Sequence, residues 1–455
     1  GEAIAWHLLS DFSEKKLLKD KEVKRITFNE ITSSAIKQAI NSSREIDQDL
    51  VDAYLARRIL DHLIGFKVSP LVWRHAPPAK SAGRVQSPSL RIICERETER
   101  DKHVKEEFWP ILSKFEFEDF IFDAELIKCN EVDLKKNPIS SEDEIKKIHT
   151  ELDSLNFYIQ SIETKPQSSS PNPPFRTSTL QMTASSFLGF TADRTMRSAQ
   201  NLYEAGLITY LRTDGINIST SPNTGEPFSE ENPGPPPIEE IRNVISEKFG
   251  EKFLSTDVRM YKSKVKNSQE AHEAIRPTNI KIYPENINLG QDEQKLYTLI
   301  WNRTLASQMS NAQHERKKII ISSSNDKYIF NASSRKTLFE GFETLSKKDS
   351  QEIIEFPDNL KEKEEVNFVD FISEQKFTSP PNRYSEASLI KKMEELGIGR
   401  PSTYASTVKG LRDKKYAYGA KSIAPSDLGR VLNSYLSGVY KEFFIETKFT
   451  AELET

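Results

Sequence analysis

The spacing of apolar residues predicts helical stretches that alternate with strand-rich ones. From Ala35 to Trp73 apolar residues recur at three- and four-residue steps, the period of an amphipathic helix. We expect its apolar stripe to consist of Leu55, Ile59, His62, Leu63 and Phe66. The charged residues between them fit a solvated helix face. The first nine residues also predict a helix, one that is already in progress at Gly1.

Beyond Glu106 the period changes to that of strands. Phe115–Glu118 alternates apolar and polar residues, and Phe120–Leu126 is rich in strand formers, so the two predict a β-hairpin. The same texture returns in the stretches 317–322, 328–331 and 366–372. Two β-rich stretches thus bracket a long helical segment. This order predicts one β domain interrupted by a helical insert, although two separate β modules would give the same pattern.

The insert begins after a linker expected at Gln167–Pro174. Thr177–Gly206 predicts helix, with Gly206 just past its end in the position that favours glycine. A loop rich in proline follows at Ser221–Pro237, where we expect a surface excursion.

Two helices with a short turn between them are predicted near the C-terminus. Ser385 is a suitable N-cap for the first, and Gly397 ends it. Gly399–Thr403 leads into the second, whose apolar positions are Tyr404, Val408 and Leu411. Helix, tight turn and helix is the outline of a helix-turn-helix, which serves ordinary packing as well as DNA binding.

Composition narrows the classes of protein to consider. The chain has 455 residues, enough for about three domains, and 64 basic against 68 acidic residues give a net charge of −4. A nucleic-acid surface would therefore be a local basic patch. The two cysteines, Cys94 and Cys129, exclude a disulfide framework and a four-cysteine zinc site. Mean hydropathy is −0.59, and no stretch has the apolar length of a membrane span.

The segment Gly206–Gly215 has the strongest chemical content. Side chains two apart on a strand share a face, so Tyr210, Arg212 and Asp214 are expected to project together. A phenol is a weak nucleophile, and a neighbouring guanidinium both favours the phenolate and binds a phosphate. Tyrosine attack on a phosphodiester needs this pair. A strand with one buried aromatic residue and a surface ion pair is the structural alternative.

A second candidate is the segment Lys80–Arg91. Ser87 and Pro88 predict the cap and first residue of a helix, with Leu90, Ile93 and Cys94 on its buried face. The preceding loop of small residues carries Arg84 and Gln86 beside a helix N-terminus, and Gly83 allows close backbone approach, which together suit a phosphate. An ordinary capped helix after a loop is the alternative.

A third candidate is Gln269–Thr278, where His272 and Arg276 lie four residues apart and would share a helix face. A zinc-protease helix needs a second histidine where Arg276 stands, so that class is excluded, and arginine there favours anion binding. A purely structural histidine is the alternative. The chain has neither a P-loop nor a dinucleotide-binding fingerprint, so nucleotide-driven chemistry has no support.

Taken together and in this order, the segments resemble the type IA DNA topoisomerases, in particular the bacterial DNA topoisomerase I family. The matching segments are Gly1–His7, Ala56–Asp61, Ser81–Pro88, Gly206–Asp214, Ala271–Thr278 and Gly397–Ala405. They run from the first residue nearly to the last.

The resemblance implies that Tyr210 cuts one DNA strand through a 5′-phosphotyrosine link and that strand passage and religation relax negative supercoils without ATP. By the same resemblance Arg212 stabilises the phosphate, and His272 and Arg276 support catalysis and DNA binding. The resemblance also implies that Asp214 contacts DNA in this segment. The implied DNA-contacting residues elsewhere are Arg57, Arg58, Asp61, Phe66, Trp73, Ser81, Ala82, Gly83, Arg84, Val85, Gln86, Arg400, Ser402, Thr403 and Lys415. The family commonly has tyrosine at the position of Phe66, so no hydroxyl contact is expected there.

In the family, the segment like Gly1–Glu2 directly follows the acidic Asp-x-Asp-x-Glu run of the Toprim domain, which binds Mg²⁺. That run is not among these 455 residues, so no metal ligand is assigned and the Mg²⁺ ligands are expected upstream of Gly1. We therefore expect a fragment of a longer enzyme that by itself relaxes DNA poorly or not at all.

The implied fold is an α+β multidomain torus with helical, CAP-like domains and a β-rich arch. The expected parts are a Toprim remnant (1–27), a helical DNA-binding domain (28–105 with 380–455), the β arch and hinge (106–170 with 311–379) and a tyrosine-bearing insert (171–310). The expected partner is a single-stranded region of negatively supercoiled DNA, bound by a monomer in a bacterial cytoplasm or an organelle, with neither membrane association nor secretion. The rival hypothesis is a non-catalytic single-strand-binding or scaffold protein of the same architecture, and a sequence-reading helix-turn-helix regulator is the weaker third.

Overall fold

A computed structural model describes residues 2–28, 31, 33–221, 234–262, 273–346, 355–440 and 445–454. The chain divides into two compact units. The first comprises residues 1–101, 172–308 and 381–455, and the second comprises residues 102–171 and 309–380. Within the described residues, no helix is long and apolar enough to cross a membrane.

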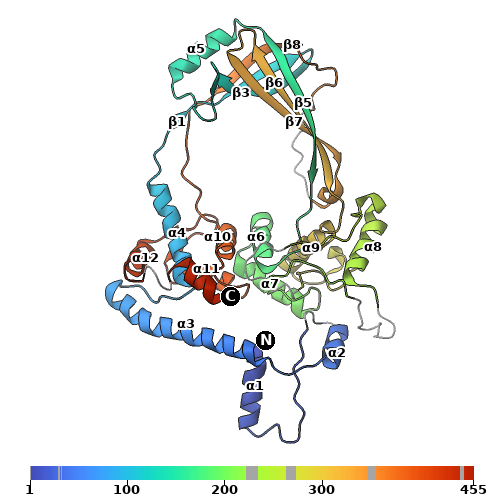
Figure 1. Cartoon of the computed structure of the whole chain (residues 1–455), viewed down its shortest axis with the longest axis vertical. Helices are drawn as coiled ribbons and strands as arrows, with labels where there is room; N and C mark the ends of the chain where they lie inside the picture. The colour runs from blue at the N-terminus through green and yellow to red at the C-terminus, as the bar shows by residue number, and fades with distance from the viewer. Residues whose placement is uncertain are drawn as a thin grey trace. The chain divides into compact units, whose positions relative to one another are not determined.

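The second unit is built on an antiparallel sheet (Figure 1). Its strands follow the order β2-β8-β5-β6-β7-β3-β4, and β2 also pairs with β3, so the sheet closes on itself. The elements are β1 (Glu107–Phe108), β2 (Ile111–Phe117), β3 (Phe120–Cys129), β4 (Val132–Asp133), α5 (Glu142–Leu152), β5 (Phe157–Ser169), β6 (Ala312–Ser323), β7 (Tyr328–Phe339), β8 (Glu365–Ser373) and β9 (Lys376–Phe377). The strands of both β-rich stretches therefore belong to one sheet, not to two modules.

Aromatic packing forms the core of this sheet. Phe115 is fully buried, and its ring meets those of Phe122, Phe157 and Phe330 at centroid distances of 5.1 to 6.3 Å. Such pairs add to the energy of apolar burial. The hairpin predicted from Phe115–Leu126 is confirmed, with Phe115 directly opposite Phe122. The linker prediction is wrong at its start, because β5 continues to Ser169 by pairing with β6.

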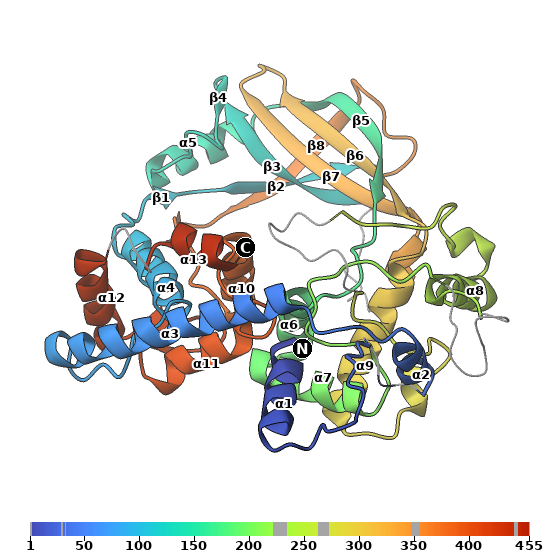
Figure 2. The ribbon, with the colours of Figure 1, turned by 60° about the horizontal axis from the view of Figure 1, so that its bottom comes forward.

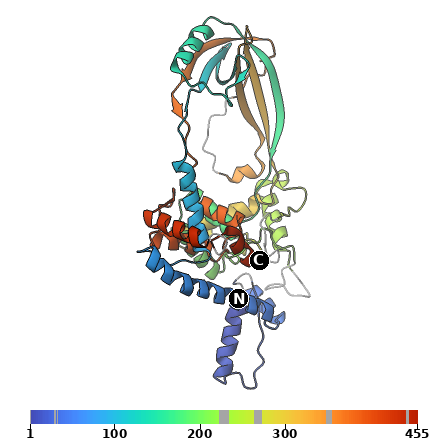
Figure 3. The same cartoon turned by 60° about the vertical axis from the view of Figure 1, so that its left-hand side comes forward.

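The first unit is mainly helical. Its helices are α1 (Glu2–Glu14), α2 (Ser33–Asn41), α3 (Gln48–His75), α4 (Gln86–Asp101), α6 (Thr177–Leu188), α7 (Ala192–Glu204), α8 (Pro237–Phe249), α9 (Gln291–Ala306), α10 (Glu386–Glu395), α11 (Tyr404–Asp413), α12 (Asp427–Val439) and α13 (Thr447–Glu454). The short strands β10 (Ala417–Tyr418) and β11 (Ala424–Pro425) pair beside them. Figure 3 shows α1 projecting away from the other helices of this unit.

The predicted apolar stripe of α3 is wrong. The buried face carries Ile64, Val68 and Val72, which pack with α4 and the C-terminal helices, whereas Ile59, Leu63 and Phe66 are exposed. The stretch from Ala35 to Trp73, predicted as one largely helical pattern, also divides into two helices, α2 and α3. Apolar residues occur on both faces of α3, so spacing alone could not tell which face is covered.

The helices around the C-terminal turn form as predicted. Ser385 caps α10 by accepting a hydrogen bond from the Ser388 backbone amide, and Gly397 follows with a left-handed φ of 70°. Tyr404, Val408 and Leu411 are buried on α11. The predicted helix start, with Ser87 as the cap and Pro88 as the first residue, is wrong by two residues, since α4 begins at Gln86 and Ser87 lies inside it. Its predicted buried face of Leu90, Ile93 and Cys94 is confirmed.

Candidate active site and neighbouring surfaces

Tyr210 lies in an extended segment that follows the end of α7. Gly206, with a φ of 70°, ends the helix as predicted, because its amide donates to the Tyr203 carbonyl and the Leu207 amide donates to the Leu202 carbonyl. An added Cβ on Gly206 would lie 2.7 Å from the Ile31 carbonyl oxygen, so only glycine fits there. The turn sets the direction in which the chain leaves α7.

Exposure alternates along this segment, although it is not a regular strand. Leu211 and Thr213 are buried, whereas Tyr210 is 40% exposed and Arg212 is exposed. Asp214 is half-buried. The alternation puts Tyr210 and Arg212 on the solvent side, which fits the predicted shared face. Within the described residues, Arg212 forms no ion pair with a carboxylate.

Three threonines hold the segment from behind. The Thr177 hydroxyl at the start of α6 lies 2.7 Å from the Leu211 carbonyl oxygen and accepts a hydrogen bond from the Thr213 amide at 2.9 Å. The Thr213 hydroxyl donates to the Glu273 carbonyl, and the Thr209 hydroxyl donates to the Ala274 carbonyl. All three threonines are buried. A buried network with its polar groups satisfied is rigid, so the backbone beneath Tyr210 is well positioned.

The ring of Tyr210 meets that of Tyr203 edge to face, with centroids 5.4 Å apart. Tyr203 lies in the last turn of α7 and is largely buried. This contact restricts the phenol without covering it. Tyr203 was not predicted to belong to the site. Its only sequence signal for such a role is its place four residues before Leu207, on a helix that ends beside the segment.

Among the predicted site residues, Arg276 has the backbone form and burial that differ most from those predicted. Residues 273–278 form no helix: Ile275 bridges to Phe175 and Pro277 bridges to Ile208. The Arg276 guanidinium is buried, and its Nε lies 2.6 Å from the Glu273 carboxylate. The helical prediction is therefore wrong for these residues, and the side chain bonds within its own segment instead of facing solvent. The backbone of Arg276 pairs with Thr209 in the segment of Tyr210. His272 lies outside the described residues.

The loop that precedes α4 is tightly held. The Arg84 side chain is buried, with its Nε 2.7 Å from Asp61 of α3. The Tyr416 hydroxyl accepts hydrogen bonds from the amides of Lys80 and Ser81 and donates to the Ser81 carbonyl. The loop thus joins α3 to the C-terminal helices. Tyr416 was missed because it is distant in sequence.

A lysine missed by the sequence analysis also reaches this loop. Lys414 donates to the Gln86 side-chain oxygen, and burial, together with the charge of Lys80, lowers its pKa. Two amines beside a helix N-terminus make the loop electropositive, which suits a phosphate. Ala82 is buried, while Ser81, Gly83 and Val85 are half-buried.

The outer face of α3 carries exposed aromatic and basic side chains. Phe66 is 69% and Trp73 57% exposed, and the His62 ring lies against that of Phe66 in a tilted contact, with centroids 4.2 Å apart. Arg58 is exposed and Arg57 half-buried on the same helix. Figure 2 shows α3 as one long helix in front of α11. Aromatic rings beside basic groups are typical of surfaces that stack single-stranded bases.

The turn between α10 and α11 places the remaining candidates. The Arg400 amide donates to the Thr403 hydroxyl at 2.8 Å, which fixes the turn, and Ser402 is exposed. Lys415 is exposed just after α11. Within the described part of the chain, no hydrogen bond or ion pair joins Tyr210 or Arg212 to this turn or to the loop before α4.

The described residues do not form a metal centre. Among them, no three His, Cys, Asp or Glu side chains lie together so as to hold a metal ion.

Comparison with known proteins places this architecture. The family model described as DNA topoisomerase matches residues 45–455. DNA topoisomerase 1 of Rickettsia bellii is 44% identical over 472 residues, covering 100% of this chain and 57% of the relative, and that of Zymomonas mobilis is 40% identical, covering 100% and 37%. The chain thus spans little more than half the length of the first of these relatives.

A solved structure agrees. The full-length topoisomerase I from Thermotoga maritima is similar with a TM-score of 0.82 and 37% identity, over 100% of this chain and 71% of that chain. The two relatives and the solved structure each align with 100% of this chain, so these alignments include every segment discussed above. The chain, with its mixture of helical and sheet-based domains, therefore belongs to the type IA, bacterial topoisomerase I family of DNA topoisomerases.

Proposed function

We propose that the protein of which these residues are part is a type IA DNA topoisomerase with Tyr210 as its nucleophile. The observation that carries the proposal is an exposed phenol, two residues from an exposed guanidinium, on a backbone held by buried threonines. A nucleophile needs access to its substrate and a fixed position, and these two requirements are met in one segment.

The reaction follows from the phenol. The Tyr210 phenol loses its proton as its oxygen attacks the phosphorus of one strand, the bond from phosphorus to the 3′-oxygen breaks, and that oxygen leaves as a 3′-hydroxyl after taking up a proton, so the protons balance. Arg212 stabilises the charge on the phosphate, and His272 assists. Religation is the reverse attack by the 3′-hydroxyl. The phosphotyrosine ester keeps the bond energy, so relaxation of negative supercoils needs no ATP.

Strand passage requires that the segment of Tyr210 separate from the rest. The helices α6 and α7, which flank this segment, make polar contacts with α10. Arg176 just before α6 and Ser178 of α6 bind the Glu394 carboxylate, with Arg176 at 2.6 Å, and the Ala192 amide of α7 donates to Glu386 at 2.8 Å. Ion pairs and hydrogen bonds can be exchanged for water when surfaces part, which supports a reversible opening.

Substrate and metal are part of the proposal. The substrate is single-stranded DNA in negatively supercoiled duplex, contacted by the aromatic face of α3 and the loop before α4. The metal is Mg²⁺, held by acidic residues that are not among these 455. The polypeptide of these residues alone is proposed to bind DNA and relax it weakly or not at all, since lost charge stabilisation at a phosphoryl group costs about 10³-fold or more.

Plasmid relaxation tests the proposal. The whole protein with Mg²⁺ should relax negatively supercoiled plasmid, and Tyr210→Phe should abolish relaxation. The 455-residue polypeptide should bind single strands but relax plasmid at least about 10³-fold more slowly. Relaxation by the Tyr210→Phe variant would refute the nucleophile.

The rival is a non-catalytic single-strand-binding protein, which the exposed aromatic face of α3 favours. It predicts salt-sensitive binding without a covalent adduct, even for the whole protein with Mg²⁺.

A further inference from the structure

An extension of the sheet in the second unit carries a concentration of positive charge. Beyond the rows shared with β8 and β3, strands β5, β6 and β7 continue as a three-stranded ribbon. Lys165 lies opposite Arg316, and Arg316 lies opposite Arg335. Two residues further along each strand, a second row places Lys318 between Glu163 and Ser333. Because side chains alternate along a strand, these two rows share one face.

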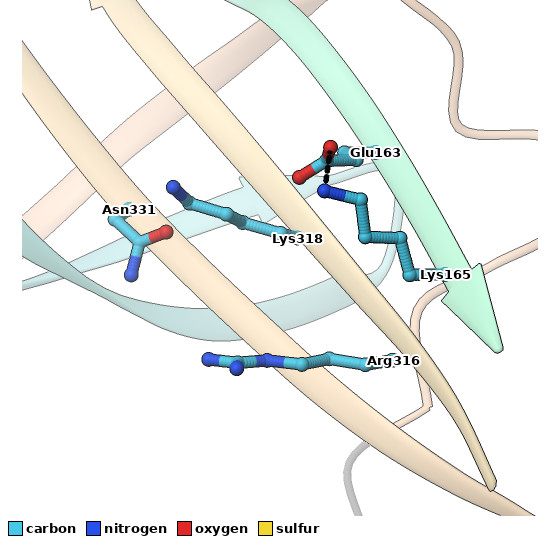
Figure 4. A pocket seen from close by; sticks show the side chains of 5 residues that line it. All are labelled: Glu163, Lys165, Arg316, Lys318 and Asn331. Carbon is cyan, nitrogen blue, oxygen red and sulfur yellow. Dashed lines mark ion pairs between the residues drawn. The ribbon is translucent and has the colours of Figure 1, made fainter. Parts of the chain in front are cut away.

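We define the basic patch as Lys165, Arg316, Lys318 and Arg335. Its first three members line a pocket of about 360 Å³ together with Glu163 and Asn331 (Figure 4). In that view Lys318 reaches toward Asn331 of β7, and Arg316 lies across β7.

The charges of the patch are only partly compensated. Glu163 pairs with Lys165, and Glu343 lies 3.5 Å from Arg335. Within the described residues, neither Arg316 nor Lys318 forms an ion pair with a carboxylate. Like charges directly opposite on neighbouring strands are destabilising, and here Arg316 faces Arg335. Four cations against two carboxylates leave an excess that an external anion would neutralise.

The opposite face of the same ribbon shows that this excess is local. Lys317 and Lys336 lie there among Glu315, Glu355 and Asp358, and Lys336 pairs with Glu355 at 2.8 Å. Cations on that face are therefore matched by acids. The segregation of charge lies between two faces of the same three strands.

We propose that the basic patch binds the phosphate backbone of double-stranded DNA, as a site separate from the single-strand surface of α3. Among the described side chains that line the pocket none is aromatic, and Ser333 and Arg335 beside them are not either. Single-strand sites combine cations with aromatic rings for stacking, whereas a duplex keeps its bases stacked and presents phosphates. The choice of DNA as the polyanion rests on the proposed function.

The test compares two variants of the 455-residue chain that lose the same net charge. Arg316→Gln/Lys318→Gln neutralises the basic patch, and Lys317→Gln/Lys336→Gln neutralises the opposite face. Binding to a blunt-ended duplex hairpin is measured by fluorescence anisotropy over a series of salt concentrations. Each lost phosphate contact reduces the slope of log affinity against log salt by about 0.9. The patch variant should therefore lose about 1.8 from this slope, and the control should keep it.

Two results would overturn the proposal. One is an equal change, or no change, in both variants, which would leave only general electrostatics. The other is a loss confined to a single-stranded oligonucleotide, which would make the patch a single-strand site. This measurement reports binding and not cleavage. A missing Tyr210 adduct would therefore refute the proposed function without changing the result for duplex binding.

Discussion

The two units of the chain differ in how far charged pairs contribute to their interiors. The second has a core of apolar residues with five phenylalanines at its centre. The first also has an apolar core, built from α3, α4 and the C-terminal helices, and it adds charged pairs that are at least partly buried. Arg84 with Asp61 and Arg176 with Glu394 join segments distant along the chain, and Arg276 pairs with Glu273 within one segment. Apolar packing stabilises without direction, while ion pairs fix position and separate at lower cost when water can enter. The difference suits a rigid sheet in the second unit and a positioned, separable site in the first.

The largest effect is expected in the aromatic core. Phe115→Ala removes a fully buried ring that touches Phe122, Phe157 and Phe330, and should lower the free energy of unfolding of the second unit by about 3–5 kcal/mol. Urea denaturation measures this change. Ile121→Ala on the same hairpin, at a position 52% exposed, is the matched control and should cost far less. Equal losses would mean that the ring cluster is not the core.

The next effect breaks the polar network of the first unit. Arg276→Met takes the guanidinium from the half-buried Glu273 carboxylate, which keeps the Ser219 amide as a donor, and should cost about 3 kcal/mol of unfolding free energy. Adduct formation by Tyr210 should fall as well, because residues 273–278 brace its segment. The double variant Glu273→Leu/Arg276→Met should recover part of the stability. A double variant that is less stable than the single one would contradict an ion-pair role.

A smaller effect concerns one hydroxyl beneath Tyr210. Thr213→Val removes the donor to the Glu273 carbonyl and the acceptor for the Gly215 amide, and should destabilise by about 1–2 kcal/mol. Thr213→Ser keeps the hydroxyl and should retain cleavage. If both variants cleave as well as the wild type, the threonine network does not position the phenol.

The smallest effect is a pH dependence. The ion pair with Arg383 lowers the pKa of Glu97 on α4, so its stabilisation is present above the ordinary pKa of 4.5 and is lost as pH falls through the lowered value. Glu97 is buried, but the glutamine amide keeps one acceptor oxygen for Arg383, so Glu97→Gln should cost about 1 kcal/mol at neutral pH, and the difference from wild type should vanish in acid. Thermal unfolding across the range from pH 3 to 7 measures it. A difference that grows in acid would reverse the sign.

Local signals in the sequence predicted much of the fold. The alternation in Phe115–Leu126 gave the hairpin, and Ser385, Gly206 and Gly397 marked helix ends by capping chemistry. The buried face of α3 and the extended form of residues 273–278 could not be predicted, because both depend on segments distant along the chain. Lys414 and Tyr416 were missed for the same reason.

The most direct test of the central claim is the strand polarity of covalent trapping. The whole protein is incubated with Mg²⁺ and a single-stranded oligonucleotide labelled at one end, and then denatured. Attack by Tyr210 on phosphorus with release of a 3′-hydroxyl predicts that a 3′-end label travels with the protein and a 5′-end label does not. Peptide mapping should place the adduct on Tyr210, and Tyr210→Phe should show none. Transfer of the 5′-end label, or an adduct that persists in Tyr210→Phe, would contradict the account.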